Sequence, residues 1–262
     1  MAKVRLADIA KEVGCSTATV SYVLNNDPRQ KINEETRKKI IQVSSILGYQ
    51  KNTIATGKTN CIGLYIGKST FPLATSDKIN FVSQVVEALA LNGYHSIMLA
   101  GAISKEVQFV DAIICIDFSE DDFIVVCSNN FIPVIGLDTH VHEPWTFEIS
   151  SNINNIVEKY YLSDYVLLHY DINSSTIKSE ILANNKNTYF ISSFVQLEMI
   201  QDQLKNKKVI VYGEAMYDYL KASNNNLIKY SINAAKKINK LIACLKLAIE
   251  HVDVDTHVYK IN

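Results

Sequence analysis

Hydrophobic residues recur at every third or fourth position near the start of the chain, a spacing that predicts amphipathic helices. Helices are expected at residues 6–13, at residues 17–24, and from residue 34 until Gly48. The expected core positions are Leu6, Ile9, Ala10, Val13, Val20, Val23, Leu24, Ile40, Val43 and Leu47. Two short helices joined by a tight turn, with a third helix closing the core, predict a helix-turn-helix.

The turn and the polar side of the second predicted helix support this interpretation. Gly14 suits the end of the first helix, because glycine tolerates the left-handed backbone there. Ser16 is expected to cap the second helix. The residues expected on the polar side of that helix are Thr17, Ala18, Thr19, Ser21, Tyr22 and Asn25. Small polar side chains with one aromatic suit a helix that enters the major groove of DNA. A helix that only packs on a core would show more Glu and Lys on that side.

Beyond residue 60, short apolar runs alternate with helical patterns, which predicts an α/β body with parallel sheets. Strands are expected at residues 61–67, 96–100, 112–116, 133–137, 165–169, 188–191 and 209–212. Helices are expected at residues 77–92, 195–204 and 231–250, and the segment 122–127 fits either a helix or a strand.

The composition narrows the class of protein. The chain has 262 residues, of which 48% are hydrophobic and 20% charged, as in folded proteins. No apolar run is long enough for a membrane helix, and the first twenty residues contain no apolar core of a secretory signal. The five cysteines are scattered without a Cys-x-x-Cys pair, so we expect a reducing cytoplasm rather than disulfides or a thiolate zinc site.

The charge is divided unevenly along the chain. The net charge is −1, yet residues 1–59 carry ten basic and five acidic residues, a net charge of +5. The three arginines of the chain, Arg5, Arg29 and Arg37, all lie in this part. A basic head on an acidic body favours contact with a polyanion, although ordinary variation of surface charge can give the same split.

The head resembles the LacI-type (lactose repressor) family of bacterial transcription regulators. The matching residues are Leu6-Ala7-Asp8-Ile9-Ala10, Gly14 through Asn25, Thr36 through Ile40, Leu47-Gly48-Tyr49 and Asn52. The resemblance implies DNA base reading by Thr17, Ala18 and Tyr22. It implies phosphate contacts, which set the position on DNA without reading sequence, by Ser16, Thr19, Ser21, Asn25 and Lys31. Tyr22 replaces the arginine common in the family, so bidentate recognition of guanine is not expected there.

The hinge that follows the head departs from the family pattern. Family members carry a short helix here, and its leucine enters the minor groove. In this chain Asn52 and Ala55 match, but the leucine is absent, and Gly57 interrupts the segment. We therefore expect a short or absent hinge helix, or a plain linker. The expected domains are a head at residues 1–50, a hinge at 51–60 and a body at 61–262.

For the body, the resemblance implies a periplasmic-binding-protein-like fold of two α/β lobes with a ligand cleft between them. The expected lobes are residues 61–143 plus 227–250, and residues 144–226 plus 251–262. The last long helix and the 77–92 helix are the expected dimer contacts. The chain is shorter than family members usually are.

The effector site is the part of the sequence that departs furthest from the family pattern. The second lobe of family members supplies an arginine to the effector, whereas no arginine follows Arg37 here. Either the body binds a different small molecule, a sugar or a related compound, or it serves mainly for dimerisation. Candidate effector contacts are Lys68, Ser69, Phe71, Asp138, Trp145 and Glu214.

Other chemistries find little support. Gly67-Lys68-Ser69 lacks the spacing of a phosphate-binding loop, and Asp138, His140 and His142 have no further metal ligand near them in sequence. We expect no catalytic residue, metal or cofactor. The resulting hypothesis is a cytoplasmic homodimer that binds a near-palindromic DNA operator, with no membrane association, and acts as a repressor. The alternatives are a DNA-binding dimer that senses no small molecule and, less well supported, a sugar-binding protein or enzyme on the same body.

Overall fold

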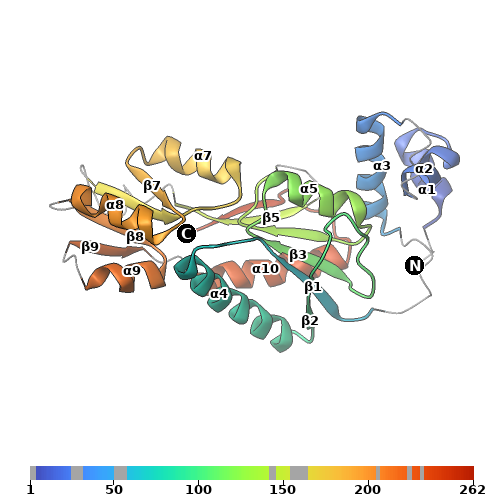
Figure 1. Cartoon of the computed structure of the whole chain (residues 1–262). Helices are drawn as coiled ribbons and strands as arrows, with labels where there is room; N and C mark the ends of the chain where they lie inside the picture. Colours follow the sequence, from blue (N-terminus) through green and yellow to red (C-terminus); the bar gives the residue numbers. More distant parts are fainter. Residues whose placement is uncertain are drawn as a thin grey trace.

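The protein has three parts in a row, a helical head and two α/β lobes, in this computed structural model (Figure 1). The structure describes residues 4–24, 32–49, 58–141, 146–153, 165–204, 207–222, 226–230 and 233–262. The expected fold class, a helix-turn-helix head followed by a two-lobed body with parallel sheets, is confirmed.

The head consists of α1 (Leu6–Val13), α2 (Thr17–Leu24) and α3 (Glu34–Leu47). The three helices share one core, made mainly of Ile9, Ala10, Val20, Val23, Leu24 and Ile40. Leu47, expected in this core, is exposed instead. Ser44 takes the buried position, and its hydroxyl donates to the Ile40 carbonyl at 2.7 Å. A polar residue can face the core here because the helix backbone itself accepts its hydrogen bond.

The head rests on the first lobe. Phe131 of the lobe packs against the core of the head. Lys38 and Ile41 of α3 line a small hollow together with Phe123 and Ile124 of the body. Figure 1 shows α3 as the head helix nearest to the body. The head is therefore placed by side-chain packing as well as by its covalent connection.

The first lobe is built on a six-stranded parallel sheet of order β10-β5-β4-β3-β1-β2. Its strands are β1 (Cys61–Ile66), β2 (His95–Met98), β3 (Ala112–Ile116), β4 (Val134–Leu137), β5 (Phe147–Ser151) and β10 (Val258–Ile261). The helices α4 (Pro72–Leu91) and α10 (Ala234–Ile249) bury their apolar sides in one core with these strands, while α5 (Glu120–Asn129) covers the other face. The central strands are buried on both faces, which is why they read as continuous apolar runs.

The second lobe is built on a four-stranded parallel sheet of order β7-β6-β8-β9. Its elements are β6 (Tyr165–Tyr170), α7 (Ser175–Asn184), β7 (Thr188–Ile191), α8 (Phe194–Leu204), β8 (Lys208–Tyr212), α9 (Glu214–Lys221) and β9 (Leu227–Tyr230). The core on one face lies under α8 and α9, and the core on the other lies under α7.

The expected division into lobes is wrong for three strands. β5 and β10 pair with each other in the first sheet, although both were assigned to the second lobe. β9 pairs with β8 in the second sheet, although it was assigned to the first. The chain therefore passes between the lobes twice, where three passages were expected. The error arose because strand pairing joins residues that are far apart in sequence, which local patterns do not report.

α4 starts earlier than the pattern predicted. Pro72 occupies its first turn, where proline needs no hydrogen-bond partner for its nitrogen. The N-terminal end, with Phe71 and Ala74, is buried in the core of the second lobe, while Val85 and Leu89 are buried in the first. α4 is thus shared by both lobes.

In the part of the chain that the structure describes, no helix is long and apolar enough to cross a membrane.

Candidate functional site

The turn between α1 and α2 has the geometry that a helix-turn-helix requires. Gly14 adopts φ +77°, and its amide donates to the Ala10 carbonyl at 3.0 Å. The Ser16 hydroxyl accepts from the Thr19 amide at 3.0 Å, which caps the first turn of α2. The two helices are thereby fixed relative to each other by local hydrogen bonds and by their shared core.

The expected base-reading residues lie together on one free side of α2. Thr17, Ala18 and Tyr22 are all exposed, and Tyr22 retains 38% of its accessible surface. Val20 and Val23 anchor the opposite side in the core. α2 can therefore present these three side chains to a groove without unfolding any part of the head.

The expected phosphate contacts are only partly placed. Ser16 is exposed, whereas Thr19 and Ser21 are half-buried beside it. The Ser16 and Thr19 hydroxyls are 2.9 Å apart and already hydrogen-bonded to each other. Asn25 and Lys31, and the hinge residues Asn52 and Ala55, lie outside the described residues, so the expectation of a shortened hinge helix stays a prediction.

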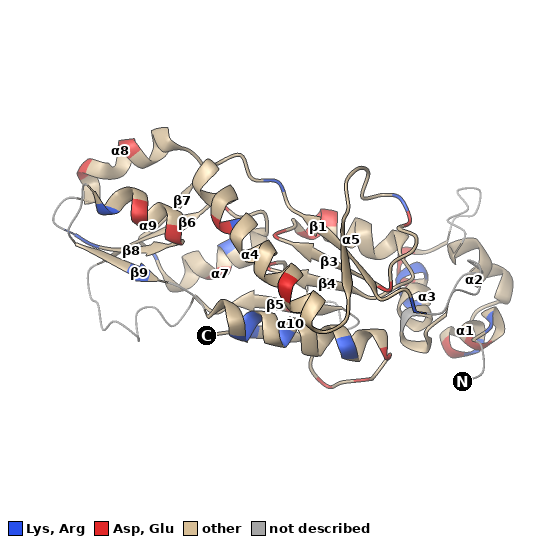
Figure 2. Cartoon of the chain, turned by 90° about the horizontal axis from the view of Figure 1, so that it is seen from below, with Lys and Arg blue, Asp and Glu red and all other residues tan. Residues whose placement is uncertain are grey.

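Charged residues of both signs lie on the surface of the head and of the body. Figure 2 shows basic segments on α3 and α10, and acidic segments on α1, α4, α8 and α9. Among the described head residues, Arg5, Lys11, Lys38 and Lys39 are exposed. Asp8, Glu12, Glu34 and Glu35 are exposed as well, so the positive excess that would attract a phosphate backbone rests on the sequence of residues 1–59, with its net charge of +5.

A cavity of about 250 Å³ lies between the two lobes. It sits at the carboxyl ends of the strands, where ligands bind in open parallel sheets. Its polar and aromatic lining includes Ser69, Asp77, Lys78, Phe81, Asp117, Asp138, Ser151, His169, Tyr170, Asp171, Tyr212, Glu214, Tyr230 and Lys237.

The structure brings three of the six candidate effector residues to this cavity. Ser69, Asp138 and Glu214 line it. Lys68 does not line it and is exposed. The expectation that Phe71 contacts an effector is wrong. Phe71 is buried in the second lobe against Tyr170 and Phe194, whose ring centroids lie 6.0 and 5.1 Å from its own.

The sixth candidate, Trp145, lies outside the described residues.

Glu214, one of the six candidate effector contacts, stands at the start of α9. It forms an ion pair with Lys229 on the neighbouring strand β9. Its carboxylate is therefore already neutralised at the edge of the cavity. A ligand that bound the same carboxylate oxygen would compete with Lys229.

Two aspartates follow neighbouring strands of the first sheet and face the cleft. Asp117 follows β3 with φ +53°, and Asp138 follows β4 with φ +55°. Left-handed backbone is uncommon outside glycine and concentrates at functional sites. Sequence reasoning identified Asp138 but missed Asp117, although both directly follow a buried strand.

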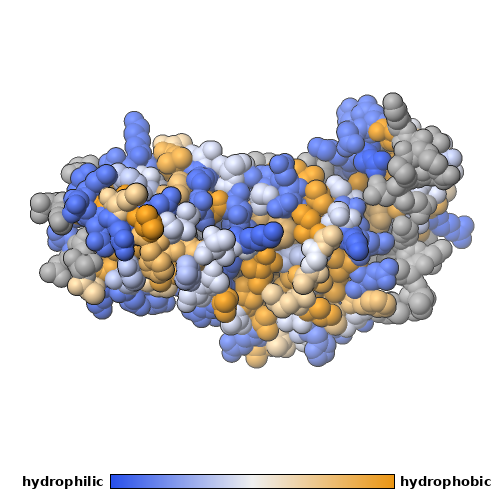
Figure 3. Space-filling view, viewed as in Figure 1, coloured by the Kyte–Doolittle hydropathy of each residue, from blue (hydrophilic) through white to orange (hydrophobic). Residues whose placement is uncertain are grey.

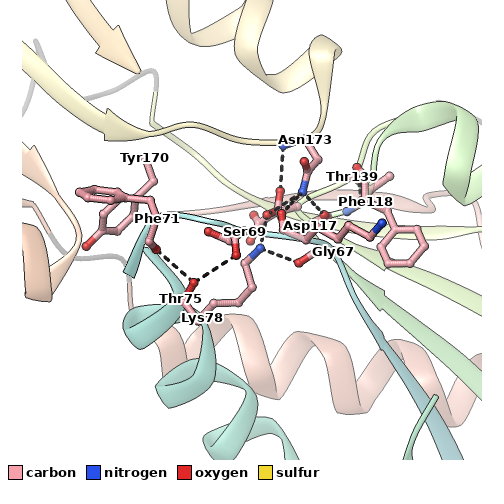
Figure 4. A network of polar contacts seen from close by, with 12 residues as sticks. Gly67, Ser69, Phe71, Thr75, Lys78, Asp117, Phe118, Thr139, Tyr170 and Asn173 are labelled. Carbon is pink, nitrogen blue, oxygen red and sulfur yellow. Dashed lines mark hydrogen bonds and ion pairs between the residues drawn. The ribbon is translucent and has the colours of Figure 1, made fainter. Parts of the chain in front are cut away.

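Each aspartate is paired with a lysine. Lys78 Nζ lies 2.6 Å from Asp117 Oδ2 and also donates to the Gly67 carbonyl at 2.9 Å (Figure 4). Burial raises the pKa of Asp117 although the Lys78 ammonium acts to lower it. The Lys237 ammonium donates to Asp138 and, at 3.2 Å, to the Ser151 hydroxyl. Among the described residues, the lysines that line the cavity, Lys78 and Lys237, are thus both held in ion pairs.

His169 is a buried residue of the cavity wall that sequence reasoning missed. Its Nδ1 lies 2.6 Å from the Tyr170 carbonyl, which can only accept, so we assign the proton to Nδ1. Its ring stacks on Tyr212 at 4.1 Å between centroids. Nε2 has no hydrogen-bond partner among the described residues. Burial lowers the pKa of His169 to about 4, so the ring is neutral at pH 7.

Acidification should therefore weaken the fold through His169. Below the ordinary pKa of 6.5 the unfolded chain binds a proton that the folded chain does not bind until about pH 4. The free energy of unfolding should fall as the pH decreases across this window. Urea unfolding at several pH values measures it, and His169→Phe, which keeps a ring against Tyr212, should flatten the dependence. The exposed His95→Gln is the control, and an unchanged pH dependence in His169→Phe would contradict the assignment.

Comparison with known proteins identifies the head. Residues 5–52 match the family model described as bacterial regulatory proteins, lacI family. The head is a LacI-family helix-turn-helix domain. The match covers α1, the turn, α2 and α3, and therefore includes every expected base-reading residue.

Curated relatives of the LacI-type head are regulators. The catabolite control protein A of Streptococcus mutans is 29% identical over 114 residues, 42% of this chain and 32% of the relative. The regulator GanR of Bacillus subtilis is 47% identical over 49 residues, 19% of this chain and 15% of the relative. The repressor PurR of Photobacterium profundum is 26% identical over 164 residues, 56% of this chain and 47% of the relative. The aligned parts thus span less than half of each of these relatives.

Solved structures show the fold of the whole chain, the LacI-type head included. The transcriptional regulator CelR in complex with cellobiose is similar with a TM-score of 0.52 at 12% identity, over 99% of this chain and 97% of that one. The lac repressor dimer bound to operator is similar with a TM-score of 0.51 at 14% identity, over 99% and 96%. A periplasmic binding protein/LacI transcriptional regulator from Alkaliphilus metalliredigens, complexed with D-xylulofuranose, has a TM-score of 0.50 at 14% identity, over 77% and 94%.

Proposed function

We propose that the chain is a sequence-specific DNA-binding transcription regulator that acts as a homodimeric repressor. The observation that carries the proposal is the free side of α2, where Thr17, Ala18 and Tyr22 stand exposed within a LacI-type head. Repression follows when the bound dimer blocks access of the polymerase to the DNA. In vitro selection from random DNA tests the proposal, and it should return a near-palindromic site, because two heads related by two-fold symmetry read two inverted half-sites. Recovery of no preferred sequence, or of a single half-site, would contradict it.

The dimer contact that the surface favours is α4 with the edge strand β2. Figure 3 shows an apolar area over this region of the first lobe. Its exposed hydrophobic residues include Ile79, Leu91, Ile97 and Met98, and Leu91 retains 82% of its accessible surface. An exposed apolar edge strand favours aggregation, and contact with a second copy of the chain would cover it. α10, the other expected contact, instead presents Lys236, Asn239 and Lys246 to solvent.

Tyr22 is expected to read sequence. Tyr22→Ala should cost about 2 kcal/mol of binding free energy on the selected site and change which bases are preferred beneath it. Lys31→Ala should weaken binding to selected and random DNA alike. It should also reduce the slope of the logarithm of the binding constant against the logarithm of the salt concentration by about one. Fluorescence anisotropy on both DNAs at several salt concentrations measures the two effects. Equal losses for Tyr22→Ala on both DNAs would contradict the base-reading assignment.

The cavity between the lobes favours a second, subordinate function, the binding of a small molecule. The body has no arginine, and Lys78 and Lys237 are already paired with Asp117 and Asp138. A neutral hydroxylated compound therefore suits the cavity better than a phosphate or carboxylate. A thermal-shift screen of sugars, sugar phosphates and nucleobases separates these classes.

A further inference from the structure

Carboxylates of the first lobe and of the shared helix α4 cap helices of the second lobe. Glu120, the first residue of α5, reaches across to the start of α7. Its oxygens accept from the Ser174 hydroxyl at 2.6 Å, the Ser175 amide and hydroxyl at 3.1 Å each, and the Thr176 amide at 3.0 Å. A carboxylate at the N-terminus of a helix satisfies amides that have no partner within the helix and interacts favourably with the helix dipole.

Hydrogen bonding determines the charge state of Glu120. Burial acts to raise the pKa of Glu120, but the hydrogen bonds from the start of α7 outweigh it and lower the pKa to about 2. The carboxylate is therefore fully ionised at neutral pH. An ionised acceptor forms the stronger kind of hydrogen bond.

Asp117 makes a second connection to the same loop of the second lobe. The Asn173 amide donates to Asp117 Oδ1 at 3.1 Å, and its side-chain nitrogen donates to the Asp117 carbonyl at 2.8 Å and to the Lys68 carbonyl at 3.1 Å. Figure 4 shows Asn173 above Asp117, with Lys78 reaching it from the other side. One residue of the second lobe thus contacts the carboxyl ends of both β1 and β3.

Asp77 makes the third connection, near the shared N-terminal end of α4. It accepts from the Tyr170 hydroxyl at 2.8 Å and from the Ala215 amide at 3.1 and 3.2 Å. Tyr170 in turn accepts from the Met216 amide at 3.0 Å. Asp77 thereby binds the start of α9 as Glu120 binds the start of α7.

We propose that Asp77, Asp117 and Glu120 form an interlobe clamp that keeps the two lobes closed without any small molecule. The carboxylates of Glu120 and Asp77 occupy the N-terminal ends of α7 and α9, where helix amides would otherwise receive an anionic ligand. The chain supplies its own anions at these positions. Closure is then the resting state of the body, and the heads keep one spacing whether or not the cavity is filled.

Hydrogen exchange on the intact chain without added ligand tests the clamp. The amides of Ser175 and Thr176 should be protected in the wild type. Glu120→Ala should speed their exchange about tenfold, because hydrogen bonds to a charged acceptor are lost. Asp121→Ala is the matched control, because Asp121 stands beside Glu120 in the same acidic first turn of α5 and is exposed. It should leave exchange at α7 unchanged.

Small-angle scattering provides an independent measurement. The wild type alone should scatter as the closed structure does, and a Glu120→Ala, Asn173→Ala double variant should have a larger radius of gyration. Circular dichroism shows whether the variants remain folded. If a variant does not fold, the measurement on the ligand-free wild type still tests the proposal. The proposal is overturned if the ligand-free wild type is open and closes only with an added compound. It is equally overturned if the double variant matches the wild type in both measurements. Neither experiment uses DNA, so failure here is distinct from failure of the proposed function.

Discussion

Asp138→Asn is expected to lower the free energy of unfolding by about 3 kcal/mol, because it leaves a buried ammonium group without its counter-charge. Lys237 retains only 4% of its side-chain surface, and Asp138 retains 30%. Asparagine fits the site in shape and tolerates the left-handed backbone of residue 138, so the loss reports the charge and not strain. Urea unfolding followed by circular dichroism measures the difference.

The matched control is Asp171→Asn, which removes the carboxylate of an exposed ion pair with Lys178. Exposed pairs contribute about 0–1 kcal/mol, so this variant should be close to the wild type. Equal losses in the two variants would show that the Asp138–Lys237 pair is no more important than a surface contact. A double variant, Asp138→Asn with Lys237→Met, should recover part of the loss, since the unpaired charge is then absent.

Gly67→Ala is expected to be at least as damaging, by about 3 kcal/mol, because the carboxyl ends of β1 and β3 meet at this residue. A Cβ atom at position 67 would lie 1.7 Å from the Asp117 carbonyl oxygen, which is backbone and cannot rotate away. The strand ends would have to separate, and the hydrogen bond from the Gly67 amide to the Ile116 carbonyl, 2.7 Å long, would be lost. Thermal unfolding measures the loss.

Gly63→Ala in the same strand is the control. Its added Cβ would lie 2.7 Å from the Leu99 Cδ1 atom, the far end of a side chain that can change rotamer. We expect a loss of about 1 kcal/mol. If Gly67→Ala were no worse than Gly63→Ala, the strand ends would be less tightly joined than the structure indicates.

The head was predictable in detail because its determinants are local. Helical spacing, Gly14 at the turn and Ser16 at the cap all act within a few residues, and the observed helices follow them. In the body, the strongly apolar strands were predicted, whereas the strands β5, β9 and β10 and the helices α7 and α9 were missed. β5 contains Glu148, Ser150 and Ser151, and its pairing with β10 depends on residues more than a hundred positions away.

The cavity was harder to predict for the same reason. Asp138 was among the candidate effector contacts, but its partner Lys237 lies on the last helix and reads in sequence as an ordinary surface lysine. Asp77 and Glu120 also resemble solvent-exposed acids at the start of helices. Only the approach of the second lobe converts them into acceptors for the first amides of α9 and α7.

α4 connects the two lobes across the cleft. Its first turn is held in the second lobe through Phe71, while its later turns lie in the first lobe and carry Leu91 on the proposed dimer surface. A rotation of the lobes would either pull Phe71 from its aromatic neighbours or tilt the whole helix against a partner subunit. In the proposed dimer, a change in the angle between the lobes would therefore change the angle between the subunits, and a signal that opened the cleft would alter the separation of the heads.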